Sequence, residues 1–211
     1  MDRKGQIDTF SRYSQVSRET ITSLIKYEEF LIKSNRSLNL IGNSTIDQIW
    51  NRHFLDSAQV IDFIDKNQKT LVDLGSGAGF PGLVISILAQ ERKIPLKIKL
   101  IEKSKRKINF LNEIIIKLNL NAVPVYQNIE DEKFNFNDDT FVARAFTPLP
   151  KIFELMHNKA KNFKKIIIFL GKNGKDGLLQ ASKNWDIKYK QRMSVTSKDS
   201  FIIEVSKLIK K

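Results

Sequence analysis

The sequence predicts an α/β fold, in which a mostly parallel β-sheet is covered by helices on both faces and joined to a helical N-terminal segment. From Thr70 onward, short apolar runs alternate with amphipathic stretches, as in βαβ units. A glycine-rich segment follows the first apolar run, where a parallel sheet binds its ligand. Neither an internal repeat nor a low-complexity linker interrupts the chain, so we expect the helical extension (residues 1–66) to pack on the domain formed by residues 67–211.

Helical spacing dominates the first 65 residues. Apolar side chains recur every three or four positions over residues 21–32, and Ser17 is placed to cap the start of this helix. A second amphipathic helix is indicated by Ser44 and by the apolar residues spaced over 46–58. The polar segment 39–43 is the expected turn between the two helices.

The rest of the chain is predicted to form seven strands. Apolar runs bounded by turn signals mark the first five, and the last two have the pattern of a closing antiparallel pair. Pro81 falls near the start of the first connecting helix, where proline is tolerated. The expected strands are 71–74, 97–101, 123–126, 140–143, 166–170, 187–195 and 201–208, and the expected helices are 83–89, 104–118 and 149–158.

The composition excludes several kinds of site. The chain of 211 residues has no Cys, which removes disulfides, thiolate nucleophiles and zinc–cysteine centres, and with only two His we expect no metal site. No apolar run approaches the roughly 18 residues that a membrane helix needs, and residues 1–16 lack the apolar stretch of a signal peptide. We therefore expect a cytoplasmic, monomeric protein with no membrane partner.

The net charge of +13 is concentrated in the last third of the chain. Residues 151–211 hold 15 basic and 5 acidic residues, whereas the first 150 are nearly balanced. This distribution indicates phosphate binding, and compositional drift in a chain rich in Lys and Ile is the alternative. The predicted basic surface includes Lys159, Lys161, Lys164, Lys165, Lys183, Lys188, Lys190, Arg192, Lys210 and Lys211.

The glycine-rich segment 72–82 is the most informative part of the chain. Gly75, Gly77 and Gly79 stand at alternate positions, where glycine allows positive φ and keeps side chains from holding a ligand off the backbone. Glu102 ends the next predicted strand, where a carboxylate can accept hydrogen bonds from both hydroxyls of a ribose. The segment thus predicts a nucleoside-containing cofactor.

Phe80 and Asp73 bear on which cofactor this is. A dinucleotide site needs glycine where Phe80 stands, so that a helix N-terminus can approach a pyrophosphate. Asp73 would repel phosphate and tolerate a cationic ligand. S-adenosylmethionine, which carries a sulfonium and an amino group, fits both residues. A nicotinamide cofactor and a purely structural turn are the alternatives.

Four segments within residues 20–172 share the order and spacing of a known family. They are Asn39-Leu40, Arg52-His53-Phe54-Leu55-Asp56-Ser57, the glycine-rich segment 72–82, and Arg144-Ala145-Phe146 with Leu149. In these segments the chain resembles the bacterial 16S ribosomal RNA guanine-N7 methyltransferases, also called the glucose-inhibited division protein B family. Their combination is far more specific than any one of them.

The resemblance implies a class I S-adenosylmethionine-dependent methyltransferase fold, with a Rossmann-like seven-stranded sheet. It also implies methyl transfer to N7 of guanine 527 of 16S ribosomal RNA, either free or in the small ribosomal subunit. The chain departs from the family pattern in three places. Glu102 stands where Asp is usual, and Gly171-Lys172 inverts the usual Lys-Gly, which leaves the role of Lys172 open. The non-basic Gln127 and Asn128 stand where a basic residue is often found, so one possible RNA contact is missing. The implied cofactor contacts are Gly75, Phe80, Ile129, Glu130 and Arg144.

Four residues are candidates for RNA binding: Arg52, His53, Phe146 and Lys172. His53 has helix packing as its alternative role. Phe146 is placed either to stack on a base or to pack in the core. Metal binding by His53 is not expected, because the other histidine, His157, is distant in the sequence.

Arg144 and the basic run 103–107 each have two interpretations. Arg144 can bind the cofactor carboxylate or an RNA phosphate, or it can form a structural ion pair with Asp138 or Asp139. The run at the start of a helix can contact phosphate or form a solvated surface.

The proposed chemistry needs no catalytic acid or base. Guanine N7 has an in-plane lone pair and no proton, so positioning alone can supply about 7 to 11 kcal/mol. The lack of Cys excludes methylation at pyrimidine carbon 5, and segment 144–150 lacks the Asn/Asp-Pro-Pro-aromatic element common in amine methylation. The alternatives are a non-catalytic RNA-binding ribosome assembly factor, which would be free to lose the glycines and Glu102, and a nicotinamide-dependent oxidoreductase, which Phe80 disfavours.

Overall fold

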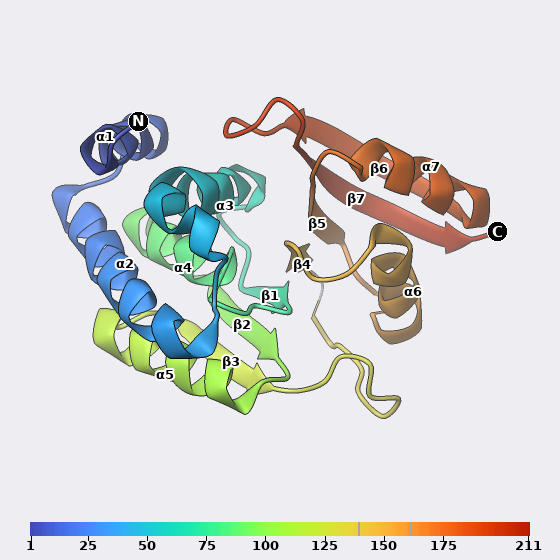
Figure 1. Cartoon of the computed structure of the whole chain (residues 1–211). Coiled ribbons are helices and arrows are strands. Elements are labelled where there is room, and N and C mark those ends of the chain that lie inside the picture. The colour runs from blue at the N-terminus through green and yellow to red at the C-terminus, as the bar shows by residue number, and fades with distance from the viewer. Residues whose placement is uncertain (139, 161) are drawn as a thin grey trace.

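A seven-stranded β-sheet forms the centre of the computed structural model, which describes residues 1–138, 140–160 and 162–211 (Figure 1). The strands lie in the order β3-β2-β1-β4-β5-β7-β6. Neighbouring strands among β1 to β5 run parallel, while β7 is antiparallel to both β5 and β6. The strands are β1 (Thr70–Leu74), β2 (Lys97–Glu102), β3 (Ala122–Tyr126), β4 (Thr140–Ala143), β5 (Lys165–Leu170), β6 (Trp185–Met193) and β7 (Phe201–Lys210).

All seven predicted strands are found, and their ends differ from the prediction by two residues at most. The reason is local: in a strand, successive side chains point to opposite faces of the sheet. Ile166 and Ile168 therefore enter one hydrophobic core and Ile167 the other. A run that is apolar at every position is the pattern of a strand buried on both faces.

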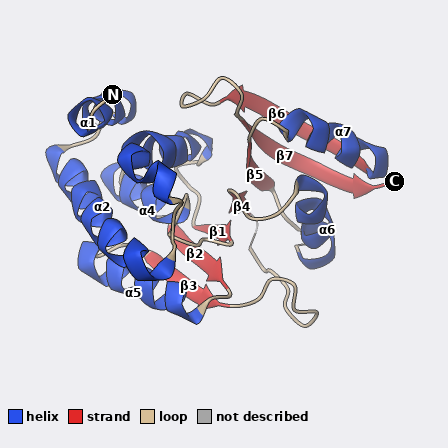
Figure 2. Ribbon diagram, in the orientation of Figure 1, coloured by secondary structure: helices blue, strands red, loops and turns tan. Residues whose placement is uncertain are grey.

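Helices cover both faces of the sheet, as Figure 2 shows. The N-terminal helices pack with α4 and α5 on one face, and α6 and α7 cover the other. Each face has its own core, one containing Phe10, Leu24 and Leu83, the other Phe153 and Ala181. The α-helices are α1 (Arg3–Ser14), α2 (Arg18–Leu38), α3 (Asp56–Ala58), α4 (Gly82–Glu91), α5 (Lys105–Leu118), α6 (Leu149–Lys159) and α7 (Gly174–Asn184).

The start of α2 confirms the predicted cap. The Ser17 hydroxyl accepts a hydrogen bond from the Thr20 backbone N–H at 3.2 Å. Ser17 and Thr20 also donate from their hydroxyls to the Glu91 carboxylate at the end of α4, at 2.7 and 2.5 Å. The cap thus fastens α2 to the sheet domain as well as beginning the helix.

The predicted second helix is wrong in form. Residues 43–63 make a 3₁₀ turn (Asn43–Gln48), a π-helical turn (Trp50–Leu55), the short α3 and another 3₁₀ turn (Gln59–Phe63). Gln6 of α1 explains part of this break, because its buried amide donates to the Asp47 carbonyl at 2.8 Å and accepts from the Asn51 N–H at 3.3 Å. A distant side chain thereby satisfies backbone groups that a regular helix would pair internally.

Helix α7 has no counterpart in the prediction. It contains Gly174 and Gly177, and only Gly174 and Ala181 are buried, so its apolar periodicity is weak. Packing against α6 and β6 supports it. Among the described residues, no helix combines the length and apolar character required to traverse a lipid bilayer.

Candidate functional site

The glycine-rich loop closes over the end of β1 and is tied to the end of β2. Gly75 and Gly77 have φ of 71° and 57°, in the left-handed region that favours glycine. Glu102 accepts hydrogen bonds from the Gly77 N–H at 3.0 Å through one carboxylate oxygen and from the Ser104 N–H at 2.8 Å through the other. The carboxylate is therefore held in place by backbone groups on both sides of it.

A cavity of about 510 Å³ opens at this carboxyl-terminal edge of the parallel strands. Its wall combines the glycine loop and the end of β2 with segments 127–130 after β3 and 144–147 after β4. His53, Leu40 and Ile41 complete it from the N-terminal segment. The predicted residues that line it are Gly75, Gly77, Phe80, Glu102, Ile129, Glu130, Arg144, Phe146 and His53.

The three loop glycines have different surroundings. A Cβ atom on Gly75 would lie 2.3 Å from the Phe146 ring, and one on Gly79 would lie 2.4 Å from Leu83. A Cβ on Gly77 would meet only the Gly75 carbonyl oxygen, at 3.8 Å. Gly79 thus allows the loop to pack on α4 and is not among the described residues that line the cavity, whereas Gly77 borders it.

Phe80 joins the cavity to the N-terminal helices. Its nearly buried ring stacks on His53 with centroids 4.9 Å apart and on Tyr27 at 5.5 Å. The Tyr27 hydroxyl donates to the Ala78 carbonyl at 2.5 Å. An aromatic residue at position 80 thereby anchors the glycine loop to α2 and to the π-helical turn, a role that sequence reasoning did not anticipate.

Asp73 lies beneath the glycine loop and is completely buried. One carboxylate oxygen accepts from the Gly82 N–H at 3.0 Å, and the other has no hydrogen-bond partner among the described residues. Burial raises the pKa of Asp73 to about 7, and the hydrogen bond from Gly82 opposes this rise only in part. Asp73 is not among the described residues that line the cavity, and its hydrogen bond from Gly82 holds the end of the loop.

Arg144 makes an ion pair with Asp56, whereas the structural alternative named Asp138 or Asp139. Its Nε donates to the Asp56 carboxylate at 2.9 Å, and Nη2 donates to the Arg52 carbonyl at 2.6 Å. Asp138 is paired with Lys99 at 2.8 Å, and Asp139 lies outside the described residues. The correct partner is 88 residues away in the sequence, so only the packed fold brings the two together.

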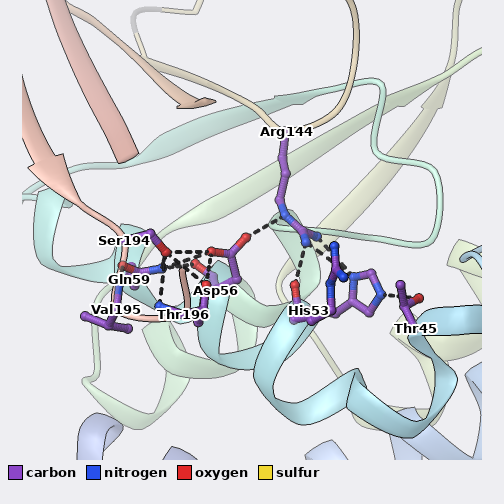
Figure 3. Close-up of polar contacts among 9 residues, drawn as sticks. Thr45, His53, Asp56, Gln59, Arg144, Ser194, Val195 and Thr196 are labelled. Carbon is purple, nitrogen blue, oxygen red and sulfur yellow. Dashed lines mark hydrogen bonds and ion pairs between the residues drawn. The ribbon is translucent and has the colours of Figure 1, made fainter. Parts of the chain in front are cut away.

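Asp56 is the centre of a network that joins three parts of the chain (Figure 3). In addition to Arg144, it accepts hydrogen bonds from the Gln59 amide at 3.1 Å, the Ser194 hydroxyl at 3.2 Å and the Thr196 hydroxyl at 2.9 Å. Gln59 in turn accepts from the Val195 N–H at 2.9 Å. The network connects the N-terminal segment, the end of β4 and the β6–β7 loop.

His53 is held neutral beside this network. Its Nε2 lies 3.0 Å from the Thr45 hydroxyl, and its Nδ1 lies 3.4 Å from the Arg144 guanidinium. Burial, with the positive charges of Arg144 and Arg52, lowers the pKa of His53 to about 3. The ring therefore serves as an uncharged wall of the cavity at physiological pH.

Comparison with known proteins identifies the family. A family model described as rRNA small subunit methyltransferase G matches residues 20–203. The chain belongs to this family. A protein named ribosomal RNA small subunit methyltransferase G from Pelagibacter ubique (strain HTCC1062) is 39% identical over 199 residues, covering 93% of this chain and 92% of that protein. One of the same name from Rickettsia akari (strain Hartford) is 37% identical, covering 93% and 98%.

Solved structures confirm the fold predicted for this member of the rRNA small subunit methyltransferase G family. A SAM-dependent methyltransferase from Aquifex aeolicus superposes with a TM-score of 0.56 at 17% identity, covering 81% of this chain and 95% of that one. M. capricolum TrmK in complex with S-adenosyl-homocysteine gives 0.53 at 19% identity, covering 72% and 67%. At these identities the similarity concerns the fold.

The predicted RNA-binding residues lie at different places relative to the cavity at the glycine loop. His53 and Phe146 line it, with Phe146 half-buried against Gly75, while Arg52 and Lys172 are exposed outside it. Glu130 is exposed and pairs with Lys151, and Ile129 beside it is buried. These placements leave contact with RNA or cofactor as a prediction for each residue.

The predicted basic surface needs correction at Lys159. This side chain is buried and donates to the carbonyls of Asp131 and Phe134, at 2.5 and 3.2 Å. Lys165 and Arg192 are occupied by ion pairs, Lys165 with Asp65 and Glu204 and Arg192 with Asp62. Lys161 lies outside the described residues. Lys183, Lys188 and Lys190 are exposed and remain candidates for phosphate binding.

Replacing Asp56 by Asn is expected to lower the free energy of unfolding by about 2 kcal/mol, because it leaves the largely buried Arg144 guanidinium without its counter-charge. Urea unfolding measures the effect. Asp62→Asn is the matched control: Asp62 also pairs with arginine, but both partners are well exposed, so the loss should stay below about 1 kcal/mol. Equal losses in the two variants would contradict a structural role for the Asp56 network.

Proposed function

We propose that this protein transfers the methyl group of S-adenosylmethionine to N7 of a guanine in small-subunit ribosomal RNA. The observation that carries the proposal is the cavity at the carboxyl edge of β1, β2 and β4, with Glu102 fixed at its wall and Gly77 open to it. It lies in a chain of the rRNA small subunit methyltransferase G family, whose relatives are matched over nearly their whole length. By resemblance, the target is the guanine at position 527.

The residues around the cavity fit S-adenosylmethionine. Each Glu102 oxygen accepts one backbone hydrogen bond and keeps a lone pair for a ribose hydroxyl. Gly77 allows a ligand to approach the loop backbone, because a Cβ there would have no neighbour closer than 3.8 Å. The nicotinamide alternative is disfavoured because the dinucleotide pattern needs glycine where Phe80 stands.

The residues of this chain act by positioning and by excluding water. When bound, S-adenosylmethionine would supply an electrophilic methyl group, whose bond to sulfur would break as the bond to guanine N7 forms, with S-adenosylhomocysteine leaving. N7 has a free lone pair and no proton, so no residue would need to act as a base. Consistent with this, His53 stays neutral and is engaged with Thr45. Stacking of Phe80 on His53 and Tyr27 fixes the glycine loop relative to the N-terminal wall of the cavity. The main contribution of the protein is therefore to orient the two reactants.

Methylation assays on 30S particles, protein-free 16S RNA and short oligonucleotides test the proposal. We expect the labelled methyl group to be transferred to one guanine. Methylation at N7 should make the RNA strand cleavable at that nucleotide after reduction and aniline treatment. Tight binding of a nicotinamide cofactor, with no binding of S-adenosylmethionine, would overturn the proposal and indicate an oxidoreductase. RNA binding with no transfer to any of the three substrates would favour the assembly-factor alternative.

The exposed lysines of β6 are expected to contribute to RNA binding. Changing Lys188 and Lys190 together to Glu should weaken binding and reduce the slope of log affinity against log salt by about one per lost phosphate contact. Filter binding of 16S RNA at roughly 50 to 300 mM salt measures this slope. Lys66→Glu, at an exposed position before β1, is the control. An unchanged slope in the double variant would assign this charge to composition alone.

A further inference from the structure

A second cavity, of about 520 Å³, shares a wall with the first. Arg144 and Ala145 line both cavities, so the short segment after β4 is the partition between them. The second cavity is enclosed by Asn51 and Arg52 from the π-helical turn, by Gly171 after β5, and by the β6–β7 loop. It opens at the same edge of the sheet as the proposed cofactor site.

The partition is held in an unusual conformation. Ala145 has φ of 50°, in the left-handed region that a residue with a Cβ rarely adopts. Arg144 beside it is fixed by Asp56, which Figure 3 shows between Arg144 and the Ser194–Thr196 side of the second cavity. A strained residue persists where its surroundings determine its conformation, and here it lies where the two cavities meet.

The wall of the second cavity suits a nucleobase. Phe169 and Phe201 supply aromatic surface. The side chains of Gln48, Asn51 and Ser200 supply amide and hydroxyl groups that make no hydrogen bonds with described residues. A guanine presents N–H donors and a carbonyl acceptor along its Watson–Crick edge, which such groups can recognise, while N7 lies on its other edge.

The rim of the second cavity is basic. Arg52 is exposed and forms no ion pair with a described residue, and Lys172 and Lys198 directly follow the lining residues Gly171 and Ser197. The acidic groups nearby are Asp56, already paired with Arg144, and the exposed Asp47 and Asp199, which are outnumbered by the three cations. A net positive rim around a polar and aromatic pocket matches the sugar–phosphate and base of one nucleotide.

We propose that the second cavity receives the target guanosine, unstacked from the ribosomal RNA strand, with its Watson–Crick edge toward Asn51 and its N7 edge toward the partition at Ala145. This rests on the proposed function of the first cavity. In this arrangement the N7 edge projects past the exposed Ala145 into the first cavity, where its lone pair faces the methyl donor, and the rim cations bind the flanking phosphates. The second cavity would then determine that guanine is selected.

Gly171→Trp tests the proposal by filling the second cavity. A Cβ on Gly171 would meet nothing within 4 Å, and Gly171 lacks a positive φ, so the backbone tolerates the side chain. We expect unchanged affinity for S-adenosylmethionine and a fall of roughly 100-fold in kcat/KM for the 30S particle. Asn67→Trp, exposed before β1, is the control and should retain full activity.

Asn51→Ala provides a second variant that adds no bulk. Loss of one hydrogen bond to the base should lower kcat/KM for the 30S particle roughly 10-fold, with unchanged cofactor affinity. If wild type methylates the 30S particle and both variants do so equally well, the second cavity is not the nucleotide site. If wild type itself transfers no methyl group to any RNA, the proposed function fails instead.

Discussion

Replacing Gly77 by Asp is expected to reduce the affinity for S-adenosylmethionine by more than about 100-fold, while the protein still folds. The Gly77 N–H donates to Glu102 at 3.0 Å, so a carboxylate at position 77 would stand beside another carboxylate at the wall of the cavity. The space around Gly77 admits a side chain, since the nearest atom to its Cβ would be 3.8 Å away. Asp also tolerates the left-handed conformation better than most residues.

Isothermal titration calorimetry with S-adenosylmethionine, together with the circular dichroism spectrum, checks this result. Gly42→Asp is the matched control, because Gly42 is exposed at a 3₁₀ N-cap where Asp is favourable. For Gly79→Ala we expect a change in stability rather than in affinity for the cofactor. Its Cβ would collide with Leu83, so we expect a loss of about 1 to 3 kcal/mol in stability before any effect on the ligand. Wild-type affinity in Gly77→Asp would show that the cofactor binds elsewhere.

Two buried groups are expected to give the protein opposite pH dependences of stability. The pKa of His53 is lowered from 6.5 to about 3 in the folded state, so as pH falls below 6.5 the unfolded chain takes up a proton that the folded chain refuses. The free energy of unfolding then falls with falling pH. The pKa of Asp73 is raised from 3.8 to about 7, so as pH rises from about 4 to 7 the unfolded chain loses a proton first. The free energy of unfolding then falls with rising pH.

Between about pH 4.5 and 6.5 the two contributions to the free energy of unfolding nearly cancel in the wild type, so each is measured in a variant that lacks the other group. Asp73→Asn leaves the His53 effect, so this variant should gain up to about 2 kcal/mol from pH 4.5 to 6.5. His53→Asn leaves the Asp73 effect and should lose a similar amount over the same roughly two-unit interval. Guanidinium unfolding at each pH measures the slopes, and the double variant should restore a flat profile. Slopes of the same sign in both single variants would show that these groups do not titrate as their burial requires.

The sequence alone determined the strands, the glycine loop and the family, because each depends on residues close together in the chain. A run of consecutive apolar side chains identifies β5, and the spacing of Gly75, Gly77 and Gly79 identifies the glycine loop. The resemblance likewise rested on short motifs, and the family model confirmed it over residues 20–203.

Tertiary structure decided which of these residues line the cavity and which only hold the fold. Gly79 packs on α4 without lining the cavity, whereas Phe80 lines the cavity and also stacks on Tyr27 of α2, although both belong to the same loop as Gly77. Gln6 contributes to the 3₁₀ and π-helical turns that replace a predicted helix, and Arg144 pairs with Asp56 while Asp138 pairs with Lys99. In each case the deciding contact joins residues that are distant in sequence. Local patterns report which face of an element is apolar, but only the packed chain determines which polar groups meet across its elements.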